Sequence, residues 1–406
     1  MQFNEVIADN HVRDRLKDLV QNNRLSHALL FLGREGSGAL PLAIAFAQYI
    51  LCEKVNPRSK SKETSLFGEA IEAEVIKLED SCGQCSSCLK VKQLVHPDLH
   101  FSYPALKRDS KHDRVLSTDY ITEWREFISQ YPYYNVADWI NFLKENSKST
   151  IENPANKQGN ITVFECDDIS HKVSLKSFES NYKILIMWMP EFLGKEGNKL
   201  LKLIEEPPPD TLFIFVAEDE NEILPTILSR TQLVKVPSLP DAAIENALIS
   251  KYNLSAEKAT EIAAISEGNF REALQILENP EEGLQTQIRE WLNVIVKNNV
   301  ATQLKWIDEI GKTGREKQKQ FLKYFIHLLE QSIRAEFLDP NMIPENERDF
   351  VLRMNKMSST EAKEAIIKDL DNSIYYIERN ANAKLLFHAL TIRIFHIIKD
   401  NSLILV

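Results

Sequence analysis

Short apolar runs separated by helical patterns fill the first 236 residues of the chain. Four of these runs predict buried strands, at residues 29–32, 183–189, 211–217 and 232–236. Apolar residues at helical spacing predict a helix after the first strand and shorter helices at 198–206 and 222–230. Strands that alternate with helices indicate a parallel sheet with helices on both faces.

The remainder of the chain is expected to be helical. After PSLP at 237–240, residues 241–278 predict small helices, 279–283 (NPEEG) a linker, and the chain from about 285 onward only helices. Two apolar stripes in this last part indicate buried helix sides. They consist of Phe321, Leu322, Phe325, Leu328, Leu329 and Ile333, and of Leu385, Leu386, Ala389, Ile392 and Phe395.

Two segments interrupt the alternation of strands and helices. Residues 53–81 are polar and predict a surface excursion. Residues 104–160 contain the aromatic-rich stretch WREFISQYPYYNVADWINFL, which we interpret as helices of an insertion. A chain of 406 residues suggests two or three domains at roughly 150 residues each.

The net charge of the chain limits the kinds of partner that it is expected to bind alone. The formal net charge is −10, whereas a protein that grips DNA alone usually carries a basic face. The first residues, MQFNEVIADN, do not form a secretory signal, and no apolar run approaches 18 residues. We therefore expect a cytoplasmic protein without membrane spans, in which thiols stay reduced and clustered cysteines bind metal rather than form disulfides.

The stretch GREGSGAL at 33–40 lies between the first strand and its helix, where a phosphate-binding loop would lie. Gly33, Gly36 and Gly38 suit such a loop, but Ala39 stands in place of the lysine and Leu40 in place of the hydroxyl. Backbone N–H groups could still form an anion nest. On these residues alone, a chance loop with glycines is an equally good interpretation.

The acidic pair that would hold magnesium at the end of the next strand is also missing. The strand runs KILIMWMPEF, so Trp188 and Met189 occupy the expected positions and Glu191 comes too late. Two independent losses indicate a catalytically silent nucleotide-binding fold.

The spacing of the cysteines strongly predicts a metal-binding site. Cys82, Cys85 and Cys88 lie in CGQCSSC, and Cys52 at the end of the first helix is the natural fourth ligand, with His96 as its rival. Four such ligands favour structural zinc. Cys166 stands apart and is expected to be merely buried, and a set of free thiols is the alternative.

Two arginines lie in turns before regular elements. Arg230 ends ILSR before a strand, and Arg271 begins a helix in GNFREAL. Taken alone, each is best explained as a salt-bridge partner.

Six stretches match one protein family. They are LSHALLFLG at 25–33, the cysteines followed by HPD at 96–98, NKLLKLIEEPPPDTLFIFVAED at 198–219, ILSRTQ at 227–232, GNFREAL at 268–274 and ERNANAKLLF at 378–387. Together they resemble the AAA+ clamp-loader ATPases, with matches to the family's zinc module, LEEPP run, S-R-C motif, sensor-2 segment and collar. Thr231 replaces the cysteine of the S-R-C motif. The resemblance covers about 1–52, 82–103 and 160–406.

That resemblance implies a RecA-like α/β AAA+ module over 1–236, which contains a zinc module at 52–88 and the insertion at 104–160. A small helical lid over 237–280 and an all-α oligomerisation collar over 281–406 would follow it. The resemblance also implies a subunit of bacterial DNA polymerase III that helps load the sliding clamp without hydrolysing ATP. Arg230 would reach as an arginine finger into the ATP site of the neighbouring gamma/tau subunit. The implied partners are gamma/tau and delta subunits and, through the assembled complex, the sliding clamp and primer–template DNA.

Two other functions compete with this one. An active ATPase needs the missing lysine and acidic pair. A zinc-dependent nucleic-acid adaptor needs a basic patch around the cysteines, and the flanking LKVKQLVH offers only Lys90 and Lys92.

Overall fold

The computed structural model describes residues 1–57, 78–109, 111–146, 159–278, 284–336, 345–379 and 381–400. They belong to two compact units, Met1–Leu274 and Gln275–Val406, and each is described by itself. The expected linker at 279–283 lies outside the described residues, as do 58–77 of the polar excursion and 147–158 of the insertion.

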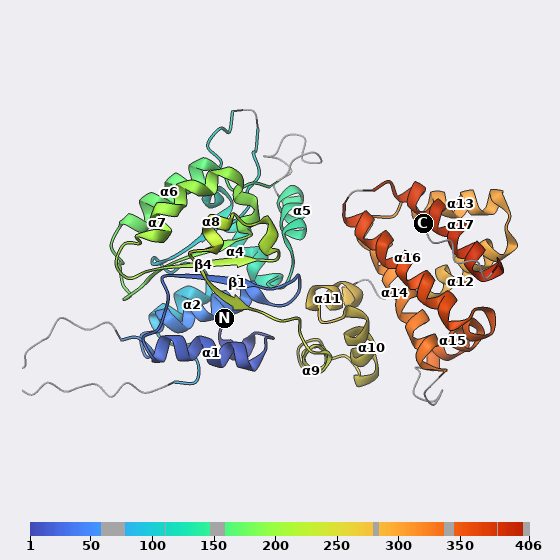
Figure 1. Ribbon diagram of the computed structural model, residues 1–406. Coiled ribbons are helices and arrows are strands. Elements are labelled where there is room, and N and C mark those ends of the chain that lie inside the picture. Colours follow the sequence, from blue (N-terminus) through green and yellow to red (C-terminus); the bar gives the residue numbers. More distant parts are fainter. Residues whose placement is uncertain are drawn as a thin grey trace, which may run out of the picture. The chain divides into compact units, whose positions relative to one another are not determined.

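A five-stranded parallel sheet forms the centre of the first unit (Figure 1). Its order is β2-β3-β4-β1-β5, and Leu29 of β1 pairs with Ile214 of β4. The strands are β1 Ala28–Leu32, β2 Leu99–Ser102, β3 Lys183–Trp188, β4 Thr211–Ala217 and β5 Gln232–Lys235. Four were predicted. The edge strand β2 was missed, although Leu99, Phe101 and Tyr103 alternate with polar residues between two prolines.

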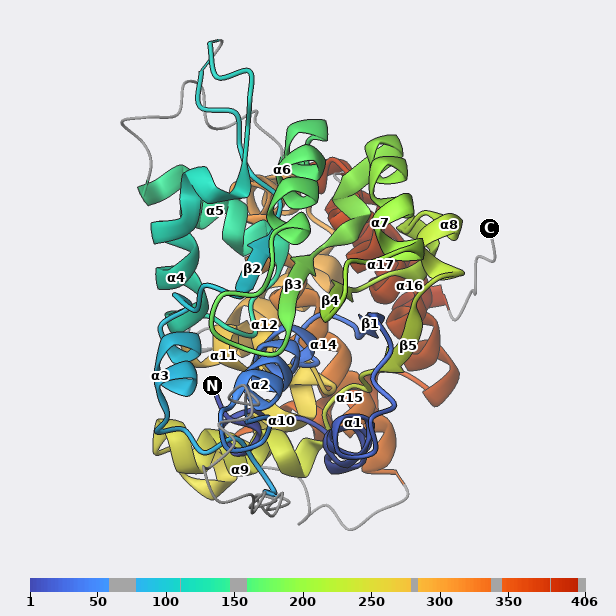
Figure 2. The same ribbon diagram turned by 90° about the vertical axis from the view of Figure 1, so that its left-hand side faces the viewer.

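Helices cover both faces of this sheet, as predicted (Figures 1 and 2). Leu29 and Phe31 of β1 point to the first face, whereas Ala28 and Leu30 point to the second. Helices on the first face are α1 Asn10–Gln21, α2 Ala39–Leu51, α3 Ser86–Lys92, α4 Ile121–Gln130 and α5 Val136–Asn146. Those on the second are α6 Val163–Ser174, α7 Leu201–Glu205 and α8 Pro225–Leu228.

The predicted insertion helices α4 and α5 belong to the core of the first unit. Trp124 stacks on Tyr103 with ring centroids 3.9 Å apart, and Trp139 and Trp188 approach its ring at 5.3 Å. The indole N–H of Trp139 donates to the carbonyl oxygen of Pro104 at 2.8 Å. This aromatic cluster joins the helices to β2 and β3.

Two predicted helices are shorter than expected, and α6 was not predicted. The segment 198–206 is α-helical only in α7, because a 3₁₀ stretch, η4 Pro190–Leu200, precedes it with a kink at Gly194 (φ 53°, ψ −150°). The segment 222–230 contains only α8, preceded by η5 Glu220–Glu222. Two further 3₁₀ turns are η1 Phe3–Glu5 and η2 Ser117–Tyr120.

The small helices after the sheet form as predicted. They are α9 Asp241–Tyr252, α10 Ala256–Ser266 and α11 Phe270–Glu278. The second unit is helical throughout its described part, with α12 Leu284–Lys297, α13 Val300–Ile310, α14 Arg315–Arg334, α15 Glu345–Met357, α16 Thr360–Glu378 and α17 Ala383–Asp400. Among the described segments, none of these helices combines the length and apolar character needed to cross a bilayer.

One of the two apolar stripes is buried and the other is not. Phe321 and Leu328 of α14 have no exposed surface. In α17, however, Leu385 is 70% and Ile392 56% exposed, so the prediction of a buried stripe was wrong there. The sequence of α17 is apolar around more than one side, and packing buries Phe387, Leu390, Ile394 and Ile397 instead.

Candidate functional site

The glycine loop connects β1 to α2, as expected for a phosphate-binding loop. Gly36 and Gly38 have φ values of 70° and 82°, in the left-handed region that favours glycine. A Cβ atom on Gly36 would lie 1.9 Å from Oδ1 of Asn269 and 2.8 Å from the backbone nitrogen of Phe270. The glycines therefore allow the loop to pack tightly against the start of α11.

The space beside this loop is nearly filled. The cavity there measures about 30 Å³, room for roughly one or two water molecules, whereas ligand pockets usually reach about 300–1,000 Å³. Tyr133 forms part of the wall, with its hydroxyl accepting the N–H of Ile7 at 2.7 Å and its ring 4.9 Å from that of Phe270. Ala39 and Leu40 are buried and bring no charge to the loop.

Glu35 at the tip of the loop is held from two sides. Its carboxylate accepts from the side-chain amides of Asn135 at 2.7 Å and Asn269 at 3.1 Å, and from Arg271 at 2.9 Å. Arg271 is 2% exposed and also forms a two-bond pair with Asp138. The interpretation of Arg271 as a salt-bridge partner is confirmed: two carboxylates neutralise this guanidinium.

Further acidic groups lie near the loop. Oε1 of Glu191 accepts the backbone N–H groups of Glu218 at 2.7 Å and Asp219 at 3.1 Å, which ties this carboxylate to the end of β4. Burial, followed by repulsion from Glu35 and Glu191, raises the pKa of Glu218 to about 8. Trp188 and Met189, at the end of β3, are buried and line the small cavity. At neutral pH the charge of Glu35, rather than that of the largely protonated Glu218, opposes the binding of phosphates.

Arg230 lies on the surface of the first unit, after α8. Its Nε donates to Oε1 of Glu205 at 2.6 Å, and Nη1 donates to the carbonyl oxygen of Thr226 at 2.8 Å and to Oγ of Ser229 at 3.0 Å. Its side chain is 33% exposed. In the single chain Arg230 is therefore a salt-bridge partner whose guanidinium remains accessible.

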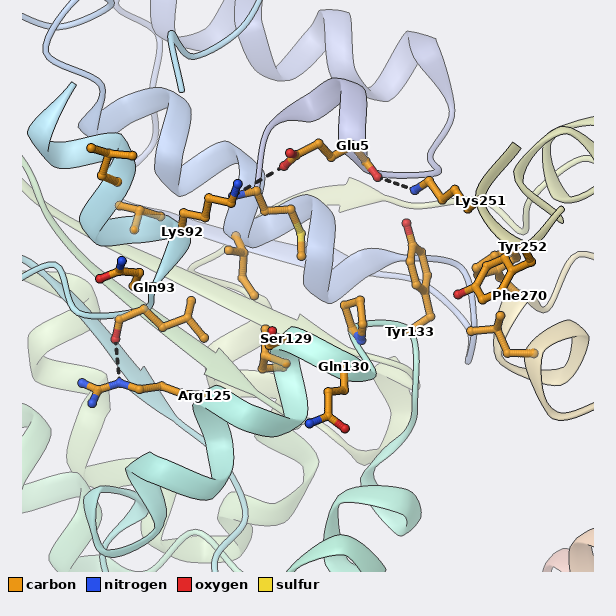
Figure 3. A pocket seen from close by; sticks show the side chains of 18 residues that line it. Glu5, Lys92, Gln93, Arg125, Ser129, Gln130, Tyr133, Lys251, Tyr252 and Phe270 are labelled. Atoms are coloured by element: carbon orange, nitrogen blue, oxygen red, sulfur yellow. Dashed lines mark hydrogen bonds and ion pairs between the residues drawn. The ribbon is translucent and has the colours of Figure 1, made fainter. Parts of the chain in front are cut away.

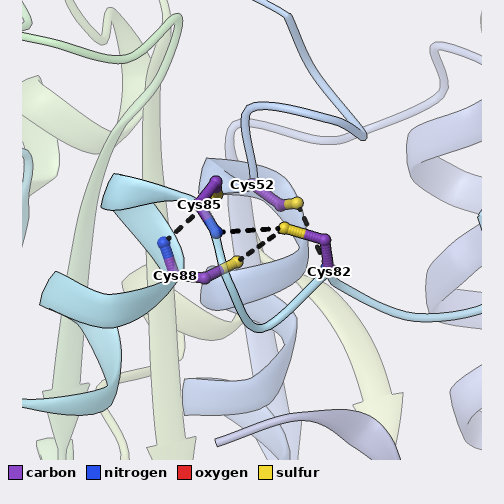
Figure 4. Close-up of side chains that lie close together, drawn as sticks. All are labelled: Cys52, Cys82, Cys85 and Cys88. Carbon is purple, nitrogen blue, oxygen red and sulfur yellow. Dashed lines mark hydrogen bonds between the residues drawn. The ribbon is translucent and has the colours of Figure 1, made fainter.

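The four predicted cysteines come together from three places (Figure 4). Cys52 ends α2, Cys82 lies in the following loop, Cys85 caps α3 and Cys88 lies within α3. All four sulfur atoms lie within 4.8 Å of one another, and those of Cys82 and Cys88 are 3.9 Å apart. Tetrahedral zinc with Zn–S bonds of about 2.3 Å requires sulfurs about 3.8 Å apart, so the donor set fits a closed zinc site.

Backbone groups favour a thiolate at Cys52, whereas burial raises the pKa of Cys85 and the neighbouring Cys52 raises the pKa of Cys88. The N–H of Cys82 points to Sγ of Cys52 at 3.4 Å, and that of Cys85 to Sγ of Cys82 at 3.3 Å. The Cys88 thiol and the N–H of Cys82 lower the pKa of Cys52. Such outer contacts orient metal ligands and tune their basicity.

His96, the rival fourth ligand, has other contacts. Its Nδ1 accepts the backbone N–H of Asp98 at 3.1 Å, and Nε2 lies 3.3 Å from Oγ of Ser87 and 3.4 Å from a carboxylate oxygen of Glu179. Burial lowers the pKa of this imidazole. Cys166 is buried in α6, outside the cluster. Nearby, Lys90 is paired with Glu179, which further weakens the nucleic-acid adaptor interpretation.

The sequence did not reveal what closes the glycine loop. Tyr133, Asn135 and Asp138 come from the aromatic-rich insertion, and Asn135 is 100 residues away from Glu35 along the chain. The charged Glu35 within the loop was the one local signal available.

Comparisons with known proteins agree on one family. Residues 8–240 match the family model described as DNA polymerase III, delta subunit. Subunit delta' of DNA polymerase III from Bacillus subtilis (strain 168) is 25% identical over 267 residues, which cover 66% of this chain and 58% of the relative. Subunit tau from the same organism is 22% identical over 283 residues, which cover 68% of this chain and 37% of the relative. The chain thus spans less than two thirds of the length of these relatives.

Among solved structures, a DNA polymerase III gamma subunit-related protein from Thermotoga maritima is similar at 12% identity. The superposition covers 94% of this chain and 97% of that one, with a TM-score of 0.34. A score this low supports no conclusion about this chain.

Proposed function

The chain belongs to the family described as DNA polymerase III, delta subunit, and on this premise we propose that it has the role of the delta-prime subunit in a clamp loader. In this role it hydrolyses no ATP itself and supplies an arginine to the ATP site of a neighbouring subunit. Its proposed partners are gamma/tau and delta subunits and, through the assembled complex, the sliding clamp and primer–template DNA.

The closed loop between β1 and α2 carries this proposal. It has neither the lysine nor the hydroxyl that phosphate transfer needs, and its cavity of about 30 Å³ cannot accommodate a nucleotide. Glu35, in the loop itself, is an acidic residue where phosphates would bind. A loop built in this way supports a scaffolding role and argues against turnover.

The accessible side chain of Arg230 supports the second half of the proposal. A guanidinium is always charged and makes two parallel bonds to phosphate oxygens as readily as to a carboxylate. The Glu205 carboxylate and the carbonyl oxygen of Thr226 hold the guanidinium of Arg230 beside α8. A neighbour's γ-phosphate would replace that carboxylate as the partner of Arg230.

Zinc has a structural part in this proposal. Cys52, Cys82, Cys85 and Cys88 would hold the ion and leave no open coordination position, so it would cross-link α2, the loop and α3 without taking part in a reaction.

The test is ATP hydrolysis and clamp loading by a reconstituted complex that contains Arg230→Ala. Arginine fingers contribute about 10³–10⁵ in rate in GTPases, but other subunits of the complex keep theirs, so we expect a partial loss of DNA-stimulated ATPase activity. Clamp loading should fall while assembly persists. Arg24→Ala is the matched control, because Arg24 is also exposed in the first unit.

Two outcomes would contradict the proposal. Normal loading by the assembled Arg230→Ala complex would leave Arg230 as a surface salt-bridge residue. ATP turnover by the isolated chain would contradict the proposal that its glycine loop is catalytically inactive.

A further inference from the structure

The first unit contains a second, much larger cavity, and we propose that it binds an acidic peptide segment through a large apolar anchor residue. The cavity measures about 830 Å³ and lies between α3 and α4 on one side and α9 and α11 on the other (Figure 3). This volume falls within the usual range of about 300–1,000 Å³ for ligand pockets. None of the functions proposed above uses it.

Aliphatic side chains form part of the walls of the cavity. Ile44 of α2, Val91 of α3 and Ile128 of α4 are buried beneath it, and Leu89 of α3 is 50% exposed at its side. A Leu or Phe side chain of a ligand would be stabilised by burial against such walls. The cavity can therefore hold an apolar anchor.

The rim of the cavity is positively charged. Lys92, Arg125 and Lys251 line it, and Glu5 is the one carboxylate among the lining residues. Nε of Arg125 donates to the carbonyl oxygen of Leu94 at 3.1 Å and Nζ of Lys251 to that of Glu5 at 2.7 Å, which fixes both cations at the rim. On a chain of net charge −10, this rim of three cations complements an acidic ligand.

The aromatic residues favour a peptide over a nucleic acid. Single-stranded nucleic acids bind to exposed aromatic faces on which successive bases stack. Here Phe270 and Tyr133 are 1% and 8% exposed, and only Tyr252, at 42%, offers an accessible ring among the lining residues. Figure 3 shows these three rings together at one end and Lys92, Gln93 and Arg125 at the other. One exposed ring cannot stack a series of bases.

The cavity is connected to the cysteine cluster. Helix α3 supplies Leu89, Val91 and Lys92 to the wall, and its first turn contains Cys85 and Cys88. The cysteine cluster therefore fixes the position of this wall. Removal of metal from the chain should weaken binding of the peptide even though no ligand of the metal lines the cavity.

The experiment measures fluorescence anisotropy of a labelled decapeptide with a central Leu-Phe pair flanked by four glutamates on each side, titrated with the full chain. We expect saturable binding that weakens as salt is raised. Lys92→Glu and Leu89→Asp should each weaken it by at least about fivefold, the equivalent of about 1 kcal/mol. Lys258→Glu and Leu175→Asp are the matched controls, because both residues are exposed and lie outside the cavity.

Circular dichroism checks that each variant is folded. A peptide with serines in place of Leu-Phe should bind more weakly, as should a chain treated with a chelator. Three results would each overturn the proposal: no binding of the decapeptide, equal losses in the cavity and control variants, or tighter cavity-dependent binding of a labelled thymidine decanucleotide than of the peptide.

Discussion

Near the glycine loop, burial strongly disfavours the charged form of the Glu218 carboxyl. Burial and the neighbouring Glu35 and Glu191 raise its pKa from 4.5 to about 8. A carboxyl with a higher pKa in the folded chain binds its proton more tightly there than in the unfolded chain. Its contribution to stability is therefore present below about pH 4.5 and is lost as the pH rises to about 8.

Replacing this carboxyl by an uncharged amide should remove the penalty. We expect the melting temperature of Glu218→Gln, relative to the parent chain, to increase between pH 5 and pH 8. The exposed Glu220→Gln is the control in the same turn. Parallel profiles for Glu218→Gln and the parent would show that the carboxyl of Glu218 is charged in the folded chain throughout this range.

Candidate site residues could be selected from the sequence, but their surroundings could not be predicted. The sequence revealed the missing lysine and the cysteine spacing because these are local patterns. It could not show that Tyr133 fills the loop or that Asp138 pairs with Arg271, since contacts between distant segments follow no local period. Glu205 likewise stood out only as part of a family run, not as the partner of Arg230.

The aromatic cluster under α4 and α5 offers a matched pair of substitutions. Trp124 and Trp139 both have 0% exposure, but the indole N–H of Trp124 has no hydrogen-bond partner among the described residues, whereas that of Trp139 donates to Pro104. Trp→Phe removes a similar volume at both positions, but at 139 it also leaves a buried carbonyl unpaired. That unpaired group costs about 1–3 kcal/mol.

Trp139→Phe should therefore unfold at lower urea concentration than Trp124→Phe, as followed by circular dichroism of the full chain. Equal midpoints would mean that the Trp139–Pro104 bond contributes no net stability.

The cysteine module links the end of α2 to the start of α3. We expect one zinc per chain by elemental analysis, and structural zinc in small peptides contributes an apparent ~10–16 kcal/mol near neutral pH. Cys52→Ala and Cys85→Ser should each lose the ion, because a methyl group binds no metal and a hydroxyl is a poor ligand for zinc.

His96→Ala and Cys166→Ala test the specificity of this assignment, and both should retain zinc. Loss of zinc in His96→Ala together with retention in Cys52→Ala would make His96 the fourth ligand.

Strands made mostly of apolar residues were predicted well, whereas elements that mix apolar and polar residues were not. Strand β4, TLFIFVA, is buried throughout and stood out in the sequence. Strand β2 has four residues with a histidine and a serine, too few for a clear alternation. Helix α17 is apolar on several sides, so its period could not show which side the second unit buries.

The exposed side of α17 bears on how the chain assembles with other subunits. Leu385 and Ile392 are 70% and 56% exposed, and their side of the helix suits the proposed collar contact. A double change, Leu385→Asp with Ile392→Asp, should alter the fold little but prevent assembly, because it places charges in an interface that excludes water.

Size-exclusion chromatography of the reconstituted complex measures this effect, with circular dichroism as the check on folding. Leu352→Asp on α15, 42% exposed, is the control in the same unit. Normal assembly of the double variant would show that this side of α17 is not the contact.

Helix α2 gives the first unit a mechanical property. It starts at the glycine loop, ends at Cys52, and all 13 of its residues are buried. Packed on every side, such a helix of about 20 Å moves as a rod, because a close-packed interior has low compressibility. A displacement of the cysteine module, for instance by a ligand bound against α3, would therefore be passed along α2 to the loop. The glycine loop and the cysteine module thus lie at the two ends of one tightly packed helix.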